Sequence, residues 1–391
     1  MTVQAAPTVD PGTRIGWRAF VDTKVAPAAG EADRSGRLPD TLLRQAGELG
    51  LWGAVLTGVG DRAHRMVRLG MLHEEIGRGC SSLRSLLTVH SMVAFTLDRW
   101  GSDQARRRWL TQVGSGALLG AFCLTEPGAG SDVAALSVTA TRIDGGYVLN
   151  GHKKWVTGGQ IAGLLLTFAR TERGISAFLV DGNNTGVHRT AVRGILGTRA
   201  SMLAEIRFVD CRIPSDALVG ADGMGLAVAT GALDIGRYSV ASGCVGIIDA
   251  CLDASIAYAT TRSQGGALLR DHQLIQRMIT DMSTDLRAAR LLCREAGELK
   301  DQGDSTTIAA TCVAKYFAST AAMRAAGDAV QLHGALGCAD EYPVSRYFRD
   351  AKVMEIIEGS TQLQQELIAG ATIQTHAGAA GSRSGVRQMT H

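Results

Sequence analysis

The stretch FCLTEPGAGSD, residues 122–132, lies close to the point where the chain changes its hydrophobic period. Before it, over about residues 37–114, apolar side chains recur at helical spacing. The helical period returns after about residue 230 and then persists. Between the two helical regions, short apolar runs alternate with turn signals, which is typical of antiparallel strands: YVLN (147–150), LLLTFA (164–169), SAFLV (176–180) and EIRFV (205–209).

The order of helices, strands and helices predicts an α+β fold that is mostly helical. We place an N-terminal helical domain at 1–117, a middle antiparallel β domain at 118–228 and a C-terminal helical bundle at 229–370. Residues 371–391 are small and polar, so we expect a flexible tail. Strands and helices do not alternate, which disfavours a parallel sheet of the dinucleotide-binding kind. We expect Ser305 to cap the helix that runs toward Gln331.

The composition is that of a globular protein of two or three domains, because 46% of the 391 residues are apolar and a domain averages about 150 residues. The net charge is +3 without a basic block, so nucleic-acid binding is not indicated. No basic segment precedes an apolar core at the start, and no run of about 18 apolar residues occurs, so we expect a cytoplasmic protein without a membrane segment. The eight cysteines form no CxxC pair, which favours reduced thiols and no metal site.

The common phosphate-binding, metalloprotease and serine-hydrolase motifs are all incomplete, so three less familiar segments carry the functional argument. The first is 122–132, which combines Thr125, Gly128, Gly130 and Ser131 at the end of a predicted strand. Such a loop presents backbone N–H groups and hydroxyls to a flat heterocycle with polar edges, or to a phosphate. An ordinary β-turn is the alternative interpretation.

The second segment is GHKKWVTGG, residues 151–159. Trp155 is followed by Gly158 and Gly159, which leave room for a ligand to approach the backbone. A tryptophan packed in the core is the alternative interpretation.

The third segment is RDAKVMEIIEGSTQ, residues 349–362. Glu358 follows two isoleucines and precedes Gly359 at a predicted helix break. Desolvation beside apolar side chains raises the pKa of a carboxyl group, as a general base working near neutral pH requires. A solvated cap or surface glutamate is the alternative.

Taken together and in this order, the three segments resemble the acyl-CoA dehydrogenase family along nearly the whole chain, from about residue 38 to 368. The resemblance implies an N-terminal helical domain, a middle β domain and a C-terminal four-helix bundle, assembled as a homodimer or homotetramer. It also implies FAD, held between the β domain and the bundle.

The resemblance implies a role for individual residues. Thr125 falls at the pyrimidine edge of the flavin, Trp155 over the ring and Thr157 near N5, while Arg262 matches an arginine that binds the pyrophosphate across a subunit interface. Glu358 matches the catalytic base. The residues implied to bind substrate are Ser131, Asp234, Arg237 and Gly359. Those implied to bind FAD are Phe122, Leu124, Thr125, Gly130, Ser131, Trp155, Val156, Thr157, Arg262, Gln273, Gln331, Gly334, Ser360, Thr361 and Gln362.

The chain also departs from the family pattern. Gly265-Gly266 stands where Phe-Gly is usual, and Ala335 replaces a glycine in the loop that begins at Gln331. Some branches of the family carry the base on an earlier helix, at the position that Gly236 occupies here. Glu358 is therefore the single candidate for the base.

The implied reaction is removal of the Cα proton of an acyl thioester by Glu358, with hydride transfer from Cβ to flavin N5. Reoxidation then falls to an electron-transferring flavoprotein or to oxygen. The run EIIEGSTQLQQ (355–365) and the short region 56–62 resemble a branch that acts on acyl groups of an acyl carrier protein, including the route to hydroxymalonyl and methoxymalonyl polyketide extender units. An ordinary short-chain or branched-chain acyl-CoA is the alternative substrate. A flavin oxidase or monooxygenase and a non-catalytic scaffold of the same fold are further alternatives.

Overall fold

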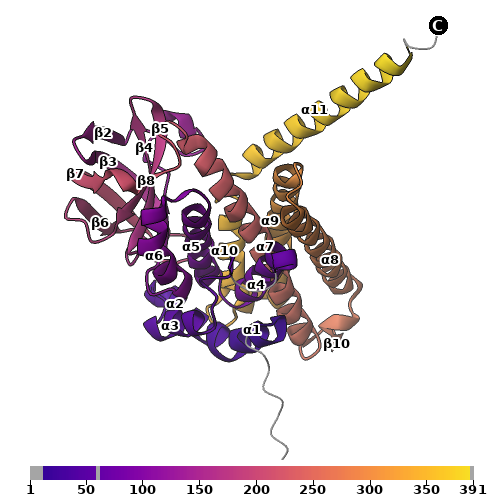
Figure 1. The fold of residues 1–391 in the computed structure, drawn as a ribbon. Helices are drawn as coiled ribbons and strands as arrows, with labels where there is room; N and C mark the ends of the chain where they lie inside the picture. The colour runs from indigo at the N-terminus through magenta and orange to yellow at the C-terminus, as the bar shows by residue number, and fades with distance from the viewer. Residues whose placement is uncertain (1–11, 59–61, 388–391) are drawn as a thin grey trace, which may run out of the picture.

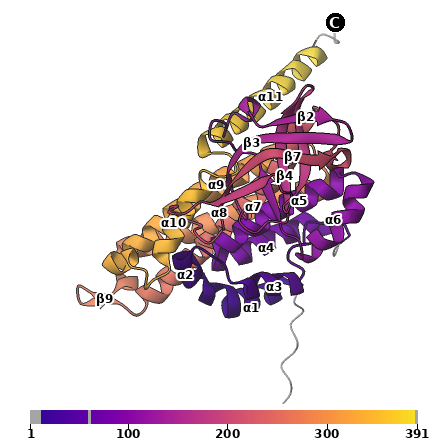
Figure 2. The same ribbon diagram turned by 90° about the vertical axis from the view of Figure 1, so that its left-hand side faces the viewer.

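The chain folds into helices, a β sheet and helices again, in the order that its hydrophobic period predicts (Figure 1). The structure is a computed structural model that describes residues 12–58 and 62–387. The predicted fold class, mostly helical with a middle β domain, is confirmed. The β sheet lies at one end of the molecule and the short strand β9 lies at the other, beyond the helices (Figure 2).

The N-terminal region is helical from residue 14 onward, which is earlier than the sequence pattern indicates. Ser102 caps the last of these helices by accepting a 3.0 Å hydrogen bond from the N–H of Ala105, and Gly116 ends it at a φ of 77°. The helices are α1 (Arg14–Phe20), the π-helix η1 (Val21–Val25), α2 (Ala26–Ser35), α3 (Asp40–Glu48), α4 (Arg65–Gly79), α5 (Ser81–Trp100) and α6 (Asp103–Ser115).

The middle region forms one 8-stranded sheet, in the order β6-β7-β3-β2-β4-β5-β8, with β1 paired to β4. All four predicted runs lie in strands. The sheet is mixed rather than purely antiparallel, because β1 and β2 both run parallel to β4. The strands are β1 (Gly120–Cys123), β2 (Thr139–Ile143), β3 (Gly146–Val156), β4 (Leu164–Thr171), β5 (Gly174–Asp181), β6 (Val187–Ala191), β7 (Ala204–Pro214) and β8 (Leu218–Val219).

The C-terminal region is built around α7, which packs against α4, α5, α8 and α9. A short hairpin of β9 (Ser263–Gln264) and β10 (Ala267–Leu268) joins α7 to α8. The helices are α7 (Gly225–Ala259), α8 (Gln273–Gln302), α9 (Thr307–His333), α10 (Val344–Met354) and α11 (Thr361–Arg387). Helix α7 begins inside the predicted β domain, four residues before its expected start at 229.

Helix α7 is long and apolar enough to cross a membrane by length and composition, with a mean hydropathy of 1.6 over its most apolar window. The sequence of α7 contains no uninterrupted apolar run from which a membrane-spanning length would be predicted. The same window is 67% buried inside the fold, as expected for the central helix of a bundle, so its apolar character has a packing explanation. Gly246 of α7 lies so close to α4 that an added Cβ would stand 2.1 Å from the carbonyl oxygen of Glu74.

Two local expectations are wrong. Helix α9 begins after Thr306, and Asp304 rather than Ser305 holds the turn, because its Oδ1 accepts hydrogen bonds from the N–H and hydroxyl of Thr306 at 2.8 and 2.7 Å. The expected flexible tail over 371–391 is helical as far as Arg387, and Figure 1 shows α11 extending away from the bundle. The segment contains no proline, so nothing in its backbone stops the helix. Residues 388–391 lie outside the described part.

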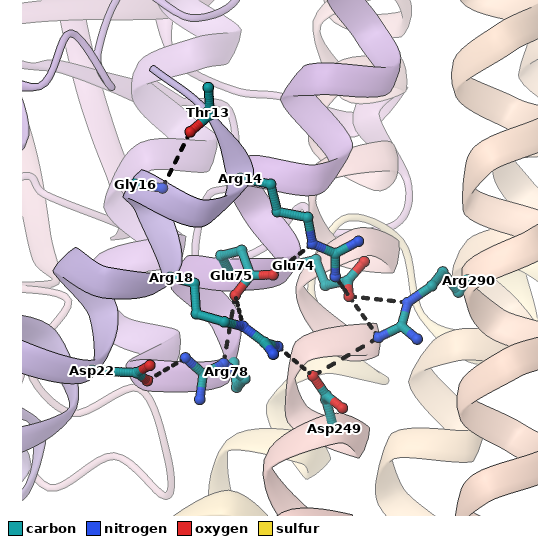
Figure 3. A network of polar contacts seen from close by, with 10 residues as sticks. All are labelled: Thr13, Arg14, Gly16, Arg18, Asp22, Glu74, Glu75, Arg78, Asp249 and Arg290. Carbon is teal, nitrogen blue, oxygen red and sulfur yellow. Dashed lines mark hydrogen bonds and ion pairs between the residues drawn. The ribbon is translucent and has the colours of Figure 1, made fainter. Parts of the chain in front are cut away.

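An ion-pair network joins the two helical regions (Figure 3). Arg14 of α1 contacts both Glu74 and Glu75 of α4, and Arg290 of α8 reaches the same Glu74 oxygen at 2.7 Å. The Glu75 side chain is fully buried, so its contacts with arginine compensate the loss of water. The N-terminal helices and the C-terminal bundle are therefore fastened together, and the site described below is built from both.

Candidate active site

The loop that follows β1 is fixed by a buried ion pair. Nζ of Lys153, on β3, lies 2.7 Å from Oε1 of Glu126 and donates to the carbonyl of Leu124 at 2.9 Å. The Glu126 carboxylate also accepts hydrogen bonds from the N–H and hydroxyl of Ser137 and from the N–H of Val138, at 2.7, 2.6 and 3.0 Å. One carboxylate therefore ties together the start of the loop, its end and the neighbouring strand.

The charge of Glu126 is maintained inside the protein. Burial raises the pKa of its carboxyl group, but the hydrogen bonds from Lys153 and Ser137 outweigh that effect and hold the pKa below its usual value. Both side chains are almost inaccessible to water, with 0% of Lys153 and 2% of Glu126 exposed. Removal of either partner would leave a buried charge without compensation.

The loop leaves open space in front of its backbone. Gly128 and Gly130 are exposed, and an added Cβ at either would meet no heavy atom within 4 Å. Ser131 is exposed and Thr125 is half-buried. Leu124 is buried behind the loop, and the half-buried ring of Phe122 packs against Phe168 at 5.1 Å between centroids, so the two apolar residues support the loop.

Trp155 points out of the sheet and is not a core residue. The pairing of β3 with β7 shifts its register between Lys153 and Val156, and Trp155 lies in this bulge with a φ of 59°. A bulge turns a side chain away from the alternation of the strand. Lys153 and Val156 are buried, whereas 53% of Trp155 is exposed. Thr157 follows, half-buried, so an indole and a hydroxyl lie at the C-terminal end of β3, which is an inner strand of the sheet.

Glu358 lies in the connection between α10 and α11, and its backbone is firmly held. Its φ of 55° is in the left-handed region, which is strained for a non-glycine residue. Its carbonyl accepts hydrogen bonds from Nε of Arg237 at 3.3 Å and from Nε2 of Gln364 at 3.1 Å. The carbonyl of the next residue, Gly359, accepts from Nζ of Lys315 at 2.7 Å and from the same Gln364 nitrogen at 3.2 Å.

Glu358 is half-buried, and one oxygen of its carboxylate is buried without a hydrogen bond. Its Oε2 atom is shielded from water and has no hydrogen-bond partner among the residues that the structure describes. Burial raises the pKa of Glu358 to about 7, against the opposing effect of Arg237, Arg84 and Lys315, which are positively charged. The structure therefore places Glu358 in a desolvated site and not in the solvated position of the alternative interpretation.

Gly236 makes room for that carboxylate. An added Cβ at Gly236 would stand 2.3 Å from Oε2 of Glu358 and 2.9 Å from Sδ of Met92. The position where other branches carry an alternative glutamate therefore adjoins the Glu358 carboxylate in space, and α7 leaves this volume empty by using glycine.

Comparison with known proteins identifies the family. Three sequence profiles match consecutive parts of the chain: the acyl-CoA dehydrogenase N-terminal domain over residues 13–117, the middle domain over 121–211 and the C-terminal domain over 223–373. The chain is 38% identical over 370 residues to the mitochondrial short-chain specific acyl-CoA dehydrogenase of Rattus norvegicus, covering 92% of this chain and 89% of the relative. The chain belongs to the acyl-CoA dehydrogenase family. It is an FAD-dependent oxidoreductase of the class that acts on CH–CH groups.

Solved structures agree with this assignment. The complex of glutaryl-coenzyme A dehydrogenase with glutaryl-CoA is 32% identical, with a TM-score of 0.89 and coverage of 96% of this chain and 97% of that one. A glutaryl-CoA dehydrogenase of Mycobacterium smegmatis in complex with FADH2 is 27% identical, with a TM-score of 0.87 and coverage of 94% and 95%. A protein for biosynthesis of the methoxymalonyl extender unit of the Fk520 polyketide is 32% identical, with a TM-score of 0.83 and coverage of 91% and 99%.

The residues present fit a flavin of this family. The loop with Gly128 and Gly130 is open in front of its backbone, and Trp155 is turned outward beside it, so a flat ring system has a polar edge and an aromatic face to contact. Thr125 and Ser131 of the loop, and Thr157 directly after β3, supply hydroxyl groups. These residues would hold the flavin, together with Ser360, Thr361 and Gln362 at the start of α11, where Ser360 Oγ accepts from the N–H of Leu363 at 3.3 Å.

A second group of predicted FAD residues lies at the other end of the molecule. Arg262, Gln273, Gln331 and Gly334 are all exposed, around the β9–β10 hairpin and the end of α9. The rings of Tyr258 and His333 stack at 4.4 Å between centroids and hold these two segments together. Figure 2 shows β9 far from β2 and β3, so one chain does not bring this group to the loop.

The hairpin also explains one departure from the family pattern. Gly265 and Gly266 have φ values of 61° and 80° and form the two-residue turn between β9 and β10. A tight hairpin turn with positive φ at both positions favours glycine and disfavours phenylalanine.

Among the residues predicted to bind substrate, Arg237 and Gly359 lie next to Glu358, the predicted catalytic base. Asp234 instead pairs with a residue of another helix. The Asp234 carboxylate forms an ion pair with Lys300 of α8, although its second oxygen is buried without a partner. Ser131 lies in the exposed loop. No group of three His, Cys, Asp or Glu side chains suited to a metal ion occurs within residues 12–58 and 62–387.

The sequence analysis missed several residues that hold the site: Glu126, Lys153, Arg84, Lys315 and Gln364. Glu126 lies in the segment 122–132 and Lys153 in the segment 151–159. They are 27 positions apart, and nothing in that spacing predicts that they form an ion pair. Arg84 and Lys315 had a usable signal, because a charge on the apolar face of a helix is unusual unless it is paired or functional.

We expect Lys153→Met to destabilise the protein by about 3–5 kcal/mol, because Glu126 would remain buried without its counterion. The loop at 124–138 would also lose an anchor, so the purified variant should contain less FAD. Lys24→Met is the control, since Lys24 is exposed on the π-helix η1 in the N-terminal region. Chemical denaturation and the flavin absorbance of both variants test this. Equal stability and equal FAD content in the two variants would show that the buried pair does not support the loop.

Proposed function

We propose that this chain oxidises the Cα–Cβ bond of an acyl thioester, with Glu358 removing the Cα proton. The observation that carries the proposal is Oε2 of Glu358, which is buried without a hydrogen-bond partner among the described residues, on a carboxyl group whose pKa is raised to about 7. A general base is most effective when its pKa lies near the working pH. The residues around it leave the oxygen free and fix only the backbone.

The protein supplies geometry and electrostatics to the reaction. FAD, when bound, accepts the hydride that leaves Cβ. Oε2 of Glu358 takes the Cα proton, and the hydrogen bonds from Arg237, Lys315 and Gln364 to the carbonyls of Glu358 and Gly359 hold the backbone that carries this side chain. The N–H of Glu358 has no acceptor in the described part of the chain, so it is available to the thioester carbonyl. A hydrogen bond there would lower the pKa of the Cα proton.

Glu358→Gln should abolish the chemistry and preserve binding. Glutamine keeps the size of the side chain but cannot accept the proton, so the rate of flavin reduction should fall by about 10²–10⁴-fold. FAD content and thioester binding should stay near those of the unmodified enzyme. Glu355→Gln, three residues earlier, is the control, because Glu355 is paired with Lys352. Anaerobic stopped-flow bleaching of the flavin measures the rates. A Glu358→Gln rate within a few-fold of the original rate would exclude Glu358 as the base.

The rate of flavin reduction should rise with pH through about 7. Only the ionised carboxylate accepts a proton, and burial raises the pKa of Glu358 to about 7. The rate should therefore be low at pH 5, half-maximal near 7 and constant above about 8.5. Single-turnover rates across this range provide the profile. A rate that is already maximal at pH 5 would mean that the base is ionised there and is not desolvated as described.

A carrier-bound substrate is the second candidate, and two observations favour it. The run at 355–365 resembles the branch that acts on acyl carrier proteins, and the similarity to the protein of methoxymalonyl extender-unit biosynthesis is 32% over 91% of this chain. In this version the enzyme oxidises a carrier-bound hydroxyacyl group toward a hydroxymalonyl or methoxymalonyl unit. Of the short region 56–62, residues 59–61 lie outside the described part.

The carrier is tested with one acyl group on two thioesters. If a carrier protein is the natural partner, the acyl-carrier thioester should reduce the flavin at least tenfold faster than the same acyl group on CoA, because carrier and enzyme surfaces also interact. Stopped-flow rates at matched concentrations measure this, with free pantetheine thioester as the control for the shared arm. Equal rates of flavin reduction by the two thioesters, or a faster rate with the CoA thioester, would exclude a carrier protein as the natural partner.

The assembly and the electron acceptor belong to the same proposal. The exposed group at Arg262, Gln273, Gln331 and Gly334 suits contact with FAD of a neighbouring subunit, which favours a homodimer or homotetramer. We further propose reoxidation by an electron-transferring flavoprotein or by oxygen, in the cytoplasm. Glu358, rather than aspartate, argues against a flavin oxidase or monooxygenase of the same fold.

A further inference from the structure

A cavity of about 910 Å³ opens between α4, α7 and α8. Buried residues form its inner end and exposed residues its mouth, and its volume suits a small organic ligand. Gly236 of α7 faces the Glu358 carboxylate, whereas Tyr238 and Ser242 of the same helix line the cavity. A step of two residues turns an α-helix by about 200°, so the cavity and Glu358 lie on opposite sides of α7.

The inner end of the cavity contains a hydroxyl group without a hydrogen-bond partner. Ser242 is 2% exposed, and its Oγ has no partner among the described residues. Ser239, one turn earlier, instead donates to the carbonyl of Ile235 at 2.7 Å, as a serine in a helix can do. Tyr238, beside Ser242, gives its hydroxyl hydrogen to the carbonyl of Met66 at 2.8 Å. A polar atom of a ligand would therefore satisfy a hydroxyl group that the protein leaves unpaired.

Apolar side chains share the cavity with this hydroxyl group. Val67 and Met71 of α4 belong to its lining. Cys293 of α8 lies beside Ser242, but a thiol is only a weak hydrogen-bond partner. Gly70 of α4 faces the same end, since an added Cβ there would stand 3.2 Å from Oγ of Ser242. The inner end therefore suits an apolar group that carries one hydrogen-bonding atom.

The mouth of the cavity is lined by arginines, most of which already have a carboxylate partner. Arg14 and Arg290 converge on the Glu74 carboxylate at 2.5 and 2.7 Å (Figure 3). Arg294 pairs at 2.7 Å with a glutamate four residues later on α8. Arg287 is exposed at the same mouth and has no ion pair with any residue in the described part of the chain. Its planar guanidinium is therefore available to an anion.

The charge left over at the mouth is positive. The remaining carboxylate of the lining, Asp301, accepts hydrogen bonds from two backbone N–H groups at the start of α4, at 2.8 and 3.2 Å. Each acidic group of the lining thus has a partner of its own. Arg287 lies six positions before Cys293 on α8, which is about 9 Å along the helix. An anion at Arg287 and a polar atom at Ser242 can therefore belong to one ligand of moderate length.

We propose that the cavity between α4, α7 and α8 binds a small amphipathic carboxylate. Its carboxylate pairs with Arg287, its apolar body lies against α4, and an oxygen at its far end forms a hydrogen bond with Ser242. The proposal concerns binding alone. It does not rest on the proposed function, because α7 separates the cavity from Glu358.

Three ligands of one chain length test the proposal on the FAD-loaded enzyme: 10-hydroxydecanoate, decanoate, which lacks the terminal hydroxyl, and methyl 10-hydroxydecanoate, which lacks the charge. Isothermal titration calorimetry of 10-hydroxydecanoate should give one site per chain. The Kd should be about tenfold or more higher for the ester and about 3- to 10-fold higher for decanoate, because hydrogen bonds to charged groups are the stronger ones. The flavin absorbance should not change, because the ligand does not contact the flavin.

Two variants assign the contacts. Arg287→Met should raise the Kd of 10-hydroxydecanoate about tenfold and leave that of the ester unchanged. Ser242→Ala should reduce the affinity for 10-hydroxydecanoate to that for decanoate. The matched controls are Arg277→Met, at an exposed position of α8 outside the cavity, and Ser239→Ala, on α7. Both controls should keep the original affinities.

Several outcomes would overturn the proposal. They are the absence of saturable binding of 10-hydroxydecanoate, an equal Kd for the acid and its ester, and an equal effect of each variant and its control. Binding that shifts the flavin absorbance would also overturn it, because the acid would then occupy the flavin site and not the cavity. None of these measurements depends on turnover, so a failure of the proposed reaction would leave the test intact.

Discussion

The desolvated carboxylate of Glu358 is the constraint on which the rest of the structure depends. A buried carboxyl group without a hydrogen-bond donor is unfavourable, and it persists only where the surroundings determine its position. Here the backbone of Glu358 and Gly359 is held by side chains from α7, α9 and α11, while the carboxylate itself is left free. The absence of a side chain at Gly236 provides the volume that the carboxylate occupies.

The loop at 122–132 and the bulge at Trp155 also combine a rigid support with a surface that is free to contact a ligand. Glu126 and Lys153 place their charges inside the β domain, where they fix the loop from within. The outer surface of that loop, with its glycines and hydroxyl groups, remains available to a ligand. The β-bulge at Trp155 likewise turns one aromatic ring outward from a strand whose neighbours are buried. In both cases buried residues hold the site in shape, and the exposed atoms remain free to contact a ligand.

Much of the fold was predictable because it depends on periodicity. The switch from helical to alternating spacing near 118 and back near 230 identifies the three regions, and all four apolar runs between them are strands. The parallel pairings of β1 and β2 with β4 were not predictable, since strand direction depends on how distant segments meet. The mistaken cap at Ser305 and the helical tail beyond 371 reflect local choices between similar residues.

The site was partly predictable for a related reason. Glu358, Trp155 and the loop at 122–132 stand in sequence contexts that are unusual in themselves. Lys153 acquires its role only from the partner that the fold brings to it, and the sequence around it is ordinary. Arg84 and Lys315 stand out only as charges on the apolar faces of α5 and α9, and that signal does not show which residues they contact. The predicted FAD residues around Arg262 show a further limit of prediction from one sequence. Within one chain they are exposed and distant from the loop at 122–132.

The central claim is that Glu358 titrates near neutral pH because it is desolvated, and infrared difference spectroscopy tests it most directly. The carboxyl C=O band is recorded against pH for the FAD-loaded enzyme, and the spectrum of Glu358→Gln is subtracted. The account predicts a protonated carboxyl band that disappears with a midpoint of about 7. A midpoint near 4.5, the ordinary value for a glutamate side chain, would contradict it.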